Sequence, residues 1–193
     1  MTSIKTIGLS GSFIIAAFFG LSSCNYNKQT DTKEVAEEQN DAKFNENKQV
    51  KDADFLVDAA EISLEEITLG KLAQEKATTT EVKQLAMELQ VKHEKALADL
   101  KNLATAKMIT IPTTLTDDGN DALDKLNNKS GKDFDKEYTD VMVNKHKDAI
   151  REFERAANES TDPDIRTWAS SSLPDLRSHL DKSLDCQKKV ENL

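Results

Sequence analysis

The sequence predicts an all-α protein built as a four-helix bundle, with two long helical hairpins joined by a crossover that contains a short helix. Apolar residues recur at spacings of three and four through four long segments, the period that places side chains on one face of a helix. Alternating strand patterns do not occur, and short polar breaks within each pair of segments predict antiparallel neighbours. These observations indicate one helical domain over residues 52–193.

The first hairpin is predicted to begin at Asp52, which we interpret as the N-cap of a helix that continues to about residue 77. The run Thr78-Thr79-Thr80-Glu81 matches a capping box. It therefore opens a second helix, which continues to about Lys107.

The crossover follows, because Ile109-Thr110-Ile111-Pro112 breaks the helical period and residues 117–128 predict only a short helix. A third long helix is expected after Gly131, over about residues 133–159. Asp162-Pro163 is an N-cap followed by proline at the first helical position, and it starts a fourth helix that ends near residue 190.

Residues 1–23 predict a lipoprotein signal peptide. Lys5 is the single charge in this stretch, and residues 13–19 form an apolar core too short to span a membrane. The run Leu21-Ser22-Ser23-Cys24 resembles the lipobox of bacterial lipoproteins. We therefore expect cleavage before Cys24 and acylation of this residue, for example with palmitate, because several acyl chains anchor a protein without a transmembrane helix.

Residues 24–51 are predicted to be the lipidated cysteine and a flexible tether, since polar residues dominate and apolar residues are isolated. A short helix around residues 35–44 would change little. The expected location is the cell envelope, at the outer membrane, with the domain on either its periplasmic or its surface face. The expected partner is the membrane itself, through the lipid anchor.

Composition argues against nucleic acid as a partner. The formal net charge is −9 and aromatic residues make up 5% of the chain, which argues against a nucleic-acid surface or a stacking platform. After Cys24 only Cys186 remains, so no disulfide can close within one mature chain.

Every histidine falls on the apolar stripe of a predicted helix, and the long helix without a histidine carries Glu66 there instead. At a rise of about 1.5 Å per residue, Glu66 and His93 come within about one turn of the same height in the first hairpin, as do His146 and His179 in the second. If the crossover aligns the two hairpins, the four side chains converge inside the bundle.

The folded part resembles a bacterial family, domain of unknown function 4142, over about residues 53–185. The resemblance rests on the segments 55–60 and 66–73, Val82-Lys83-Gln84-Leu85-Ala86, Lys92-His93, Phe134-Asp135, Tyr138, His146, Asp162-Pro163, Leu173-Pro174 and His179-Leu180. It implies a ferritin-like four-helix bundle, and members are often labelled outer-membrane proteins. The family frequently has aspartate where this chain has Lys92, and it implies no activity.

The inward polar set has three interpretations. Imidazole and carboxylate groups suit Zn, Cu, Fe or Mn, so Glu66, His93, His146 and His179 are candidate metal ligands. The same groups could instead hydrogen-bond across the core and fix the helix register, with Gly70 allowing close helix packing. In the third interpretation, the bundle docks an envelope protein through its charged outer faces.

Catalysis receives little support from the sequence. The Glu-x-x-His pairs of di-iron bundles are absent, because Gln90, Val143 and Leu176 stand three residues before the histidines. The glycines form no phosphate loop, and the serines at 170–172 lie within a predicted helix. We assign no catalytic residue and no certain cofactor. An envelope lipoprotein with a binding or structural role is favoured, and a metal-binding bundle, redox or stress-related, is the alternative.

Overall fold

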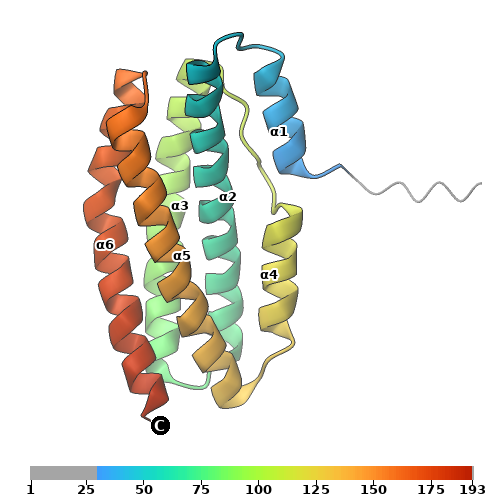
Figure 1. Cartoon of the computed structure of the whole chain (residues 1–193). Helices are drawn as coiled ribbons and strands as arrows, with labels where there is room; N and C mark the ends of the chain where they lie inside the picture. The colour runs from blue at the N-terminus through green and yellow to red at the C-terminus, as the bar shows by residue number, and fades with distance from the viewer. Residues whose placement is uncertain (1–29, 193) are drawn as a thin grey trace, which may run out of the picture.

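The computed structural model describes residues 30–192, and the regular elements in this range are six helices (Figure 1). Four of them are long and form the bundle: α2 (Asn47–Lys76), α3 (Thr80–Lys107), α5 (Gly131–Glu159) and α6 (Pro163–Glu191). The all-α four-helix prediction is therefore confirmed. No helix in the described range is both long and apolar enough to span a membrane. The predicted signal peptide and Cys24 lie outside the described residues.

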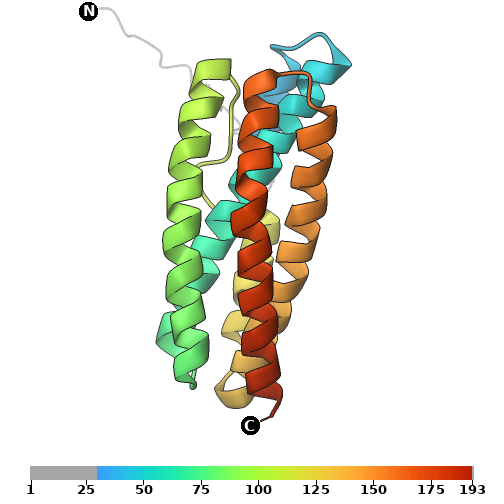
Figure 2. The ribbon, with the colours of Figure 1, turned by 90° about the vertical axis from the view of Figure 1, so that its left-hand side faces the viewer.

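The bundle is made of two hairpins, in which α2 packs along α3 and α5 packs along α6. The connection from α3 to α5 runs back along the length of the bundle and contains α4 (Asp117–Asn127), which lies against α2 and α5 (Figures 1 and 2). Because of this long return, α3 and α5 run in one direction while α2 and α6 run in the other (Figure 1). The crossover with a short helix is thus present as predicted.

Side-chain caps start α3, α4 and α6. The cap at Asp162 is the one predicted, the cap of α3 is Thr79 rather than Thr78 of the predicted capping box, and the cap of α4 was not predicted. Thr79 accepts from the backbone N–H of Val82 at the start of α3, and Asp162 accepts from the N–H of Ile165 at 3.2 Å at the start of α6. Thr116 caps α4 through a 3.1 Å bond from the N–H of Gly119. The starts of α3 and α6 were readable because their capping signals lie beside the helices that they serve.

Asp52 does not begin a helix, so its prediction as an N-cap of the first bundle helix is wrong. The helix α2 begins at Asn47, and Asp52 is a buried residue inside it. Its carboxylate accepts from the backbone N–H groups of Thr161 at 3.2 Å and Asp162 at 3.0 Å, and from the Thr161 hydroxyl at 2.8 Å. Asp52 therefore holds the turn between α5 and α6.

Asp135, near the start of α5, holds the turn of the first hairpin in the same way. Its buried carboxylate accepts from the N–H and the hydroxyl of Thr78 and from the N–H of Thr79, in the turn between α2 and α3. Along the chain, Asp52 is as far from Asp135 as Thr79 is from Asp162. Each hairpin thus supplies the carboxylate that holds the turn of the other hairpin.

The segment 32–51 is not a free tether, which corrects the sequence prediction. Residues 32–41 form α1 (Thr32–Asp41), which packs on the outside of α2 beside the crossover (Figure 1). Ala36 and Asn40 are fully buried there. The Asn40 amide oxygen accepts from the N–H of Thr110 and its amide nitrogen donates to the Thr110 carbonyl, both at 2.8 Å. A polar side chain therefore ties α1 to the crossover.

Lys33 fixes the other end of α1 to the bundle. Its ammonium lies 2.6 Å from Asp58 and 2.7 Å from Glu61, both on α2. Glu152 of α5 shares a hydrogen bond with Asp58. Burial and the negative charge of Asp58 raise the pKa of Glu152 to about 7, against a partial lowering by Arg155 and Lys33.

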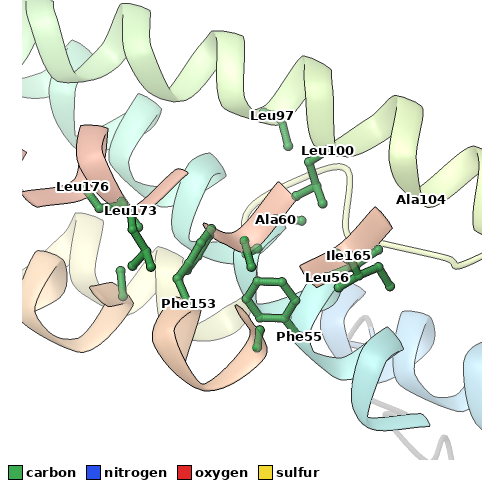
Figure 3. Packing of buried hydrophobic residues seen from close by; sticks show 14 of the residues in the cluster. Phe55, Leu56, Ala60, Leu97, Leu100, Ala104, Phe153, Ile165, Leu173 and Leu176 are labelled. Atoms are coloured by element: carbon green, nitrogen blue, oxygen red, sulfur yellow. The ribbon is translucent and has the colours of Figure 1, made fainter. Parts of the chain in front are cut away.

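The apolar core forms two clusters, one towards each end of the bundle. One cluster is centred on Phe55 and Phe153, whose rings meet edge to face with centroids 5.0 Å apart (Figure 3). The other contains Leu69, Phe134 and Tyr138. Glu66 and the three histidines lie between the two clusters along their helices. A polar layer therefore divides the core.

Candidate metal centre

Each long helix contributes one side chain to the polar layer. Glu66 comes from α2, His93 from α3, His146 from α5 and His179 from α6. Their exposed fractions are 1%, 4%, 0% and 4% respectively, so all four are buried. The structure brings together all four residues that the helical spacing placed on inward faces.

Two of the histidines lie against the Glu66 carboxylate, and the third lies beside both of their rings. Its Oε2 atom lies 3.2 Å from Nε2 of His93, and its Oε1 atom lies 3.5 Å from Nδ1 of His146. The imidazole centroids are 5.3 Å apart for His146 and His179, 5.5 Å for His93 and His179, and 5.8 Å for His93 and His146. One nitrogen from each histidine lies within 4.8 Å of those of the other two.

These groups are poorly satisfied by hydrogen bonds. Nδ1 of His146 lies 2.9 Å from the Met142 carbonyl, a contact that holds the ring when this nitrogen carries the proton. Within residues 30–192, no hydrogen-bond partner is found for Nε2 of His146, either nitrogen of His93 and His179, or either oxygen of Glu66. Glu66 and His93 nevertheless contact each other at 3.2 Å, and this contact helps to lower the pKa of Glu66.

Burial and mutual repulsion set the charges of the cluster. Burial first, and then repulsion by His93 and His146, lower the pKa of His179 to about 4, against a partial raising by Glu66 and Asp175. Burial by itself raises the pKa of Glu66, but attraction to His93 and His146 outweighs it and brings the pKa to about 2. At neutral pH the cluster therefore offers a carboxylate and a neutral His179, the protonation states that bind metal ions.

A pocket of about 180 Å³ leads from the surface to this cluster. Buried His93 and His179 line its inner part, whereas the exposed side chains of Lys92, Lys95 and Asp175 line its outer part. Glu66 and His146 do not line it. The cluster thus has a closed side and a side that reaches solvent.

Two buried groups near the cluster were not assigned a role from the sequence. Glu65 follows the same helix but points away to Lys145, whose ammonium lies 2.5 Å from its Oε2 atom. The Tyr138 hydroxyl is buried without a hydrogen-bond partner in the described part of the chain, and burial together with the charges of Glu66 and Cys186 raises its pKa. A lysine immediately before His146 was the sequence signal for the Glu65 pair.

Gly70 allows the close helix approach that its position suggested. A Cβ atom at this residue would lie 3.0 Å from the Ala86 carbonyl oxygen and 3.3 Å from Cβ of Gln90. The helices α2 and α3 therefore approach closely one turn from Glu66.

Comparisons with known proteins agree with this architecture. The family described as "Domain of unknown function (DUF4142)" matches residues 34–185. Among solved structures, the crystal structure of a DUF305 fragment from Deinococcus radiodurans is similar with a TM-score of 0.63 and 10% sequence identity, covering 74% of this chain and 97% of that one. This likeness shows the fold alone. No curated protein gives a significant match.

Proposed function

We propose a function for this chain, which belongs to the DUF4142 family of domains of unknown function: it binds one transition-metal ion inside the bundle. The ligands are His93, His146 and His179 with the carboxylate of Glu66. The single observation that carries the proposal is the convergence of three buried imidazoles, with nitrogens within 4.8 Å of one another, two of which lie against the carboxylate of Glu66.

The hydrogen-bond pattern favours a metal site over residues that only fix the helix register. A buried polar atom without a partner costs about 1–3 kcal/mol, so a register-setting histidine is expected to hydrogen-bond its neighbours. Here most of the imidazole nitrogens and both Glu66 oxygens lack such partners within the described range. A metal ion would supply the missing partner to one atom of each side chain.

The donor set supports a single ion of the Zn, Cu, Fe or Mn type. Imidazole with one carboxylate suits these metals, and only Glu66 contributes an acid to the described cluster because Glu65 is paired with Lys145. Ligand atoms with bonds of about 2.1 Å lie at most about 4.2 Å apart, so small rotations of the imidazoles would bring the set into range. The Met142 carbonyl would orient His146.

The test is metal content. The chain without residues 1–24 is purified, offered Zn, Cu, Mn and Fe separately, and measured by elemental mass spectrometry. We expect about one equivalent of at least one metal. Replacing His146 or His179 with alanine should abolish binding while circular dichroism shows that the helices persist.

Ser183 gives a matched control, because it is also fully buried and its hydroxyl bonds the His179 carbonyl at 2.8 Å. The variant Ser183→Ala should keep the metal. A wild-type protein that takes up none of the four metals, or histidine variants that bind as well as wild type, would overturn the proposal.

We also propose that the domain is held in the cell envelope by lipid on Cys24, supported by the run Leu21-Ser22-Ser23-Cys24 after a short apolar core. In cells fed labelled palmitate, the wild-type protein should become labelled and fractionate with membranes. Cys24→Ser should lose both properties. A labelled Cys24→Ser protein, or an unlabelled wild type, would contradict the anchor.

A further inference from the structure

We propose that the metal centre keeps one coordination position for an exchangeable ligand, a small monoanion with an apolar body such as an aromatic carboxylate. The inference rests on the proposed metal site and names what that site receives. The ligand enters through the pocket that leads to His93 and His179.

The position of the opening comes from the asymmetry of the cluster. Glu66 and His146 are 1% and 0% exposed and do not line the pocket, so they close the site from α2 and α5. His93 and His179 line the pocket from α3 and α6. An ion held by this cluster would therefore face the pocket, where a ligand could enter by expanding the ion from four to five ligands, an expansion that zinc undergoes in some catalytic sites.

The size of the pocket selects a small organic ligand. A cavity of about 150 Å³ admits benzene. The pocket measures about 180 Å³, which leaves space for one aromatic ring and a carboxylate. A single water would fill only a small part of it, since water occupies about 30 Å³ in the liquid.

The pocket walls indicate an apolar body. Ile62, Phe153, Trp168 and Leu176 line the pocket and belong to, or pack against, the apolar cluster centred on Phe55. Such walls with a few convergent polar groups are typical of small-molecule sites. The two imidazoles are the polar groups at the inner end, and serines and charged side chains lie elsewhere along the wall.

Charge indicates an anion. A divalent ion beside the single Glu66 carboxylate leaves net positive charge in a buried site, and buried charge is costly unless it is paired. Lys92 and Lys95 line the outer part of the pocket together with Asp99 and Asp175, and Lys95 pairs with Asp99 at 2.6 Å. The rim therefore carries no net charge, and the metal ion supplies the attraction for an anion. Lys92 pairs with Asp175 across α3 and α6 at 3.5 Å, with side chains 45% and 67% exposed, so the rim contact is weak enough to open.

The experiment loads the full mature domain with Co²⁺, measures its stoichiometry, and then titrates benzoate while recording the visible absorption of the metal. We expect a saturable spectral change with benzoate. Benzyl alcohol, a neutral molecule of similar shape, should bind at least tenfold more weakly.

Two alanines on α3 give a matched pair of variants. Ala96 lines the pocket, whereas Ala98 is exposed on the same helix and does not line it. Ala96→Phe should fill the pocket and weaken benzoate binding at least tenfold while cobalt remains bound at wild-type stoichiometry. Ala98→Phe should behave as wild type.

The outcomes separate this inference from the proposed function. Cobalt bound without a response to benzoate overturns the open position and leaves the metal site standing. Equal benzoate binding in the Ala96→Phe and wild-type proteins overturns the route, and equal binding of benzyl alcohol overturns the anionic class. A protein that binds none of cobalt, zinc, copper, manganese and iron overturns both proposals.

Discussion

Replacing Glu152 with glutamine should stabilise the protein at pH 8 and leave it almost unchanged at pH 5. The folded state raises the pKa of Glu152 from 4.5 to about 7, because of burial first and the charge of Asp58 second. The folded protein therefore keeps a proton that the unfolded chain releases, and stability falls as pH rises from 4.5 through 7. A glutamine has no such proton to lose, and its amide can still donate to Asp58.

The size of the effect follows from the same numbers. At 1.36 kcal/mol per pH unit, the difference between 4.5 and about 7 corresponds to roughly 3 kcal/mol. The Glu152 side chain is 21% exposed, so solvent screening reduces this, and we expect about 1–3 kcal/mol.

Urea denaturation followed by circular dichroism at both pH values measures the effect. Glu159→Gln, an exposed substitution on the same helix, is the control and should show the same change in stability at pH 5 and pH 8. If Glu152→Gln changes stability equally at the two pH values, the reasoning about its shared proton with Asp58 is refuted.

Three further predictions concern the histidine cluster, the turn between α2 and α3, and the packing of α2 on α3. The free energy of unfolding of the metal-free protein should fall by up to roughly 3 kcal/mol between pH 6.5 and pH 4, because the unfolded chain protonates His179 before the folded state does. Urea titrations should show a smaller fall for His179→Phe, and an equal fall would refute the assignment. Asp135→Ala should cost about 3 kcal/mol, since it leaves the Thr78 and Thr79 donors without their carboxylate, and thermal unfolding beside exposed Asp133→Ala tests this. Gly70→Ala should destabilise the protein by about 1–2 kcal/mol, because crowding against the Ala86 carbonyl outweighs a gain of about 1 kcal/mol in helix propensity. A more stable variant in the same assay would mean that α3 can move away from α2.

The long helices were predictable because their signals are local. Asp162 and Thr79 cap helices that start beside them, and the apolar stripes repeat at the helical period. Asp52 has the same residue type before an apolar run, but its partners lie in a turn far along the chain. Local pattern cannot distinguish these two uses of aspartate.

The docking of α1 was missed for a related reason. Its interface is held by Lys33 with Asp58 and by Asn40 with Thr110, rather than by an apolar stripe. Composition indicates a solvated segment there, because polar residues that pair across the fold look the same in sequence as polar residues that face water.

In the candidate site, too, some features follow from local sequence and others depend on contacts between distant segments. Spacing identified the inward faces of Glu66 and the three histidines, and hairpin lengths gave their heights. Alignment of the two hairpins depends on the crossover and on contacts between them, such as those of Asp52 with Asp162 and of Asp135 with Thr78. The pocket beside His93 and His179 depends on side chains from all four long helices, so no segment of the sequence contains it.

The reciprocal aspartates also bear on how the chain is made. Synthesis proceeds from the N-terminus, so α2 and α3 leave the ribosome before Asp135 exists to hold their turn. For the turn between α5 and α6 the order is the reverse, because Asp52 has already been synthesised when Thr161 and Asp162 leave the ribosome. The first hairpin must wait for the second, and the same event that secures both turns brings Glu66 and His93 to His146 and His179. Formation of the polar layer is thereby deferred until nearly the whole domain has been synthesised.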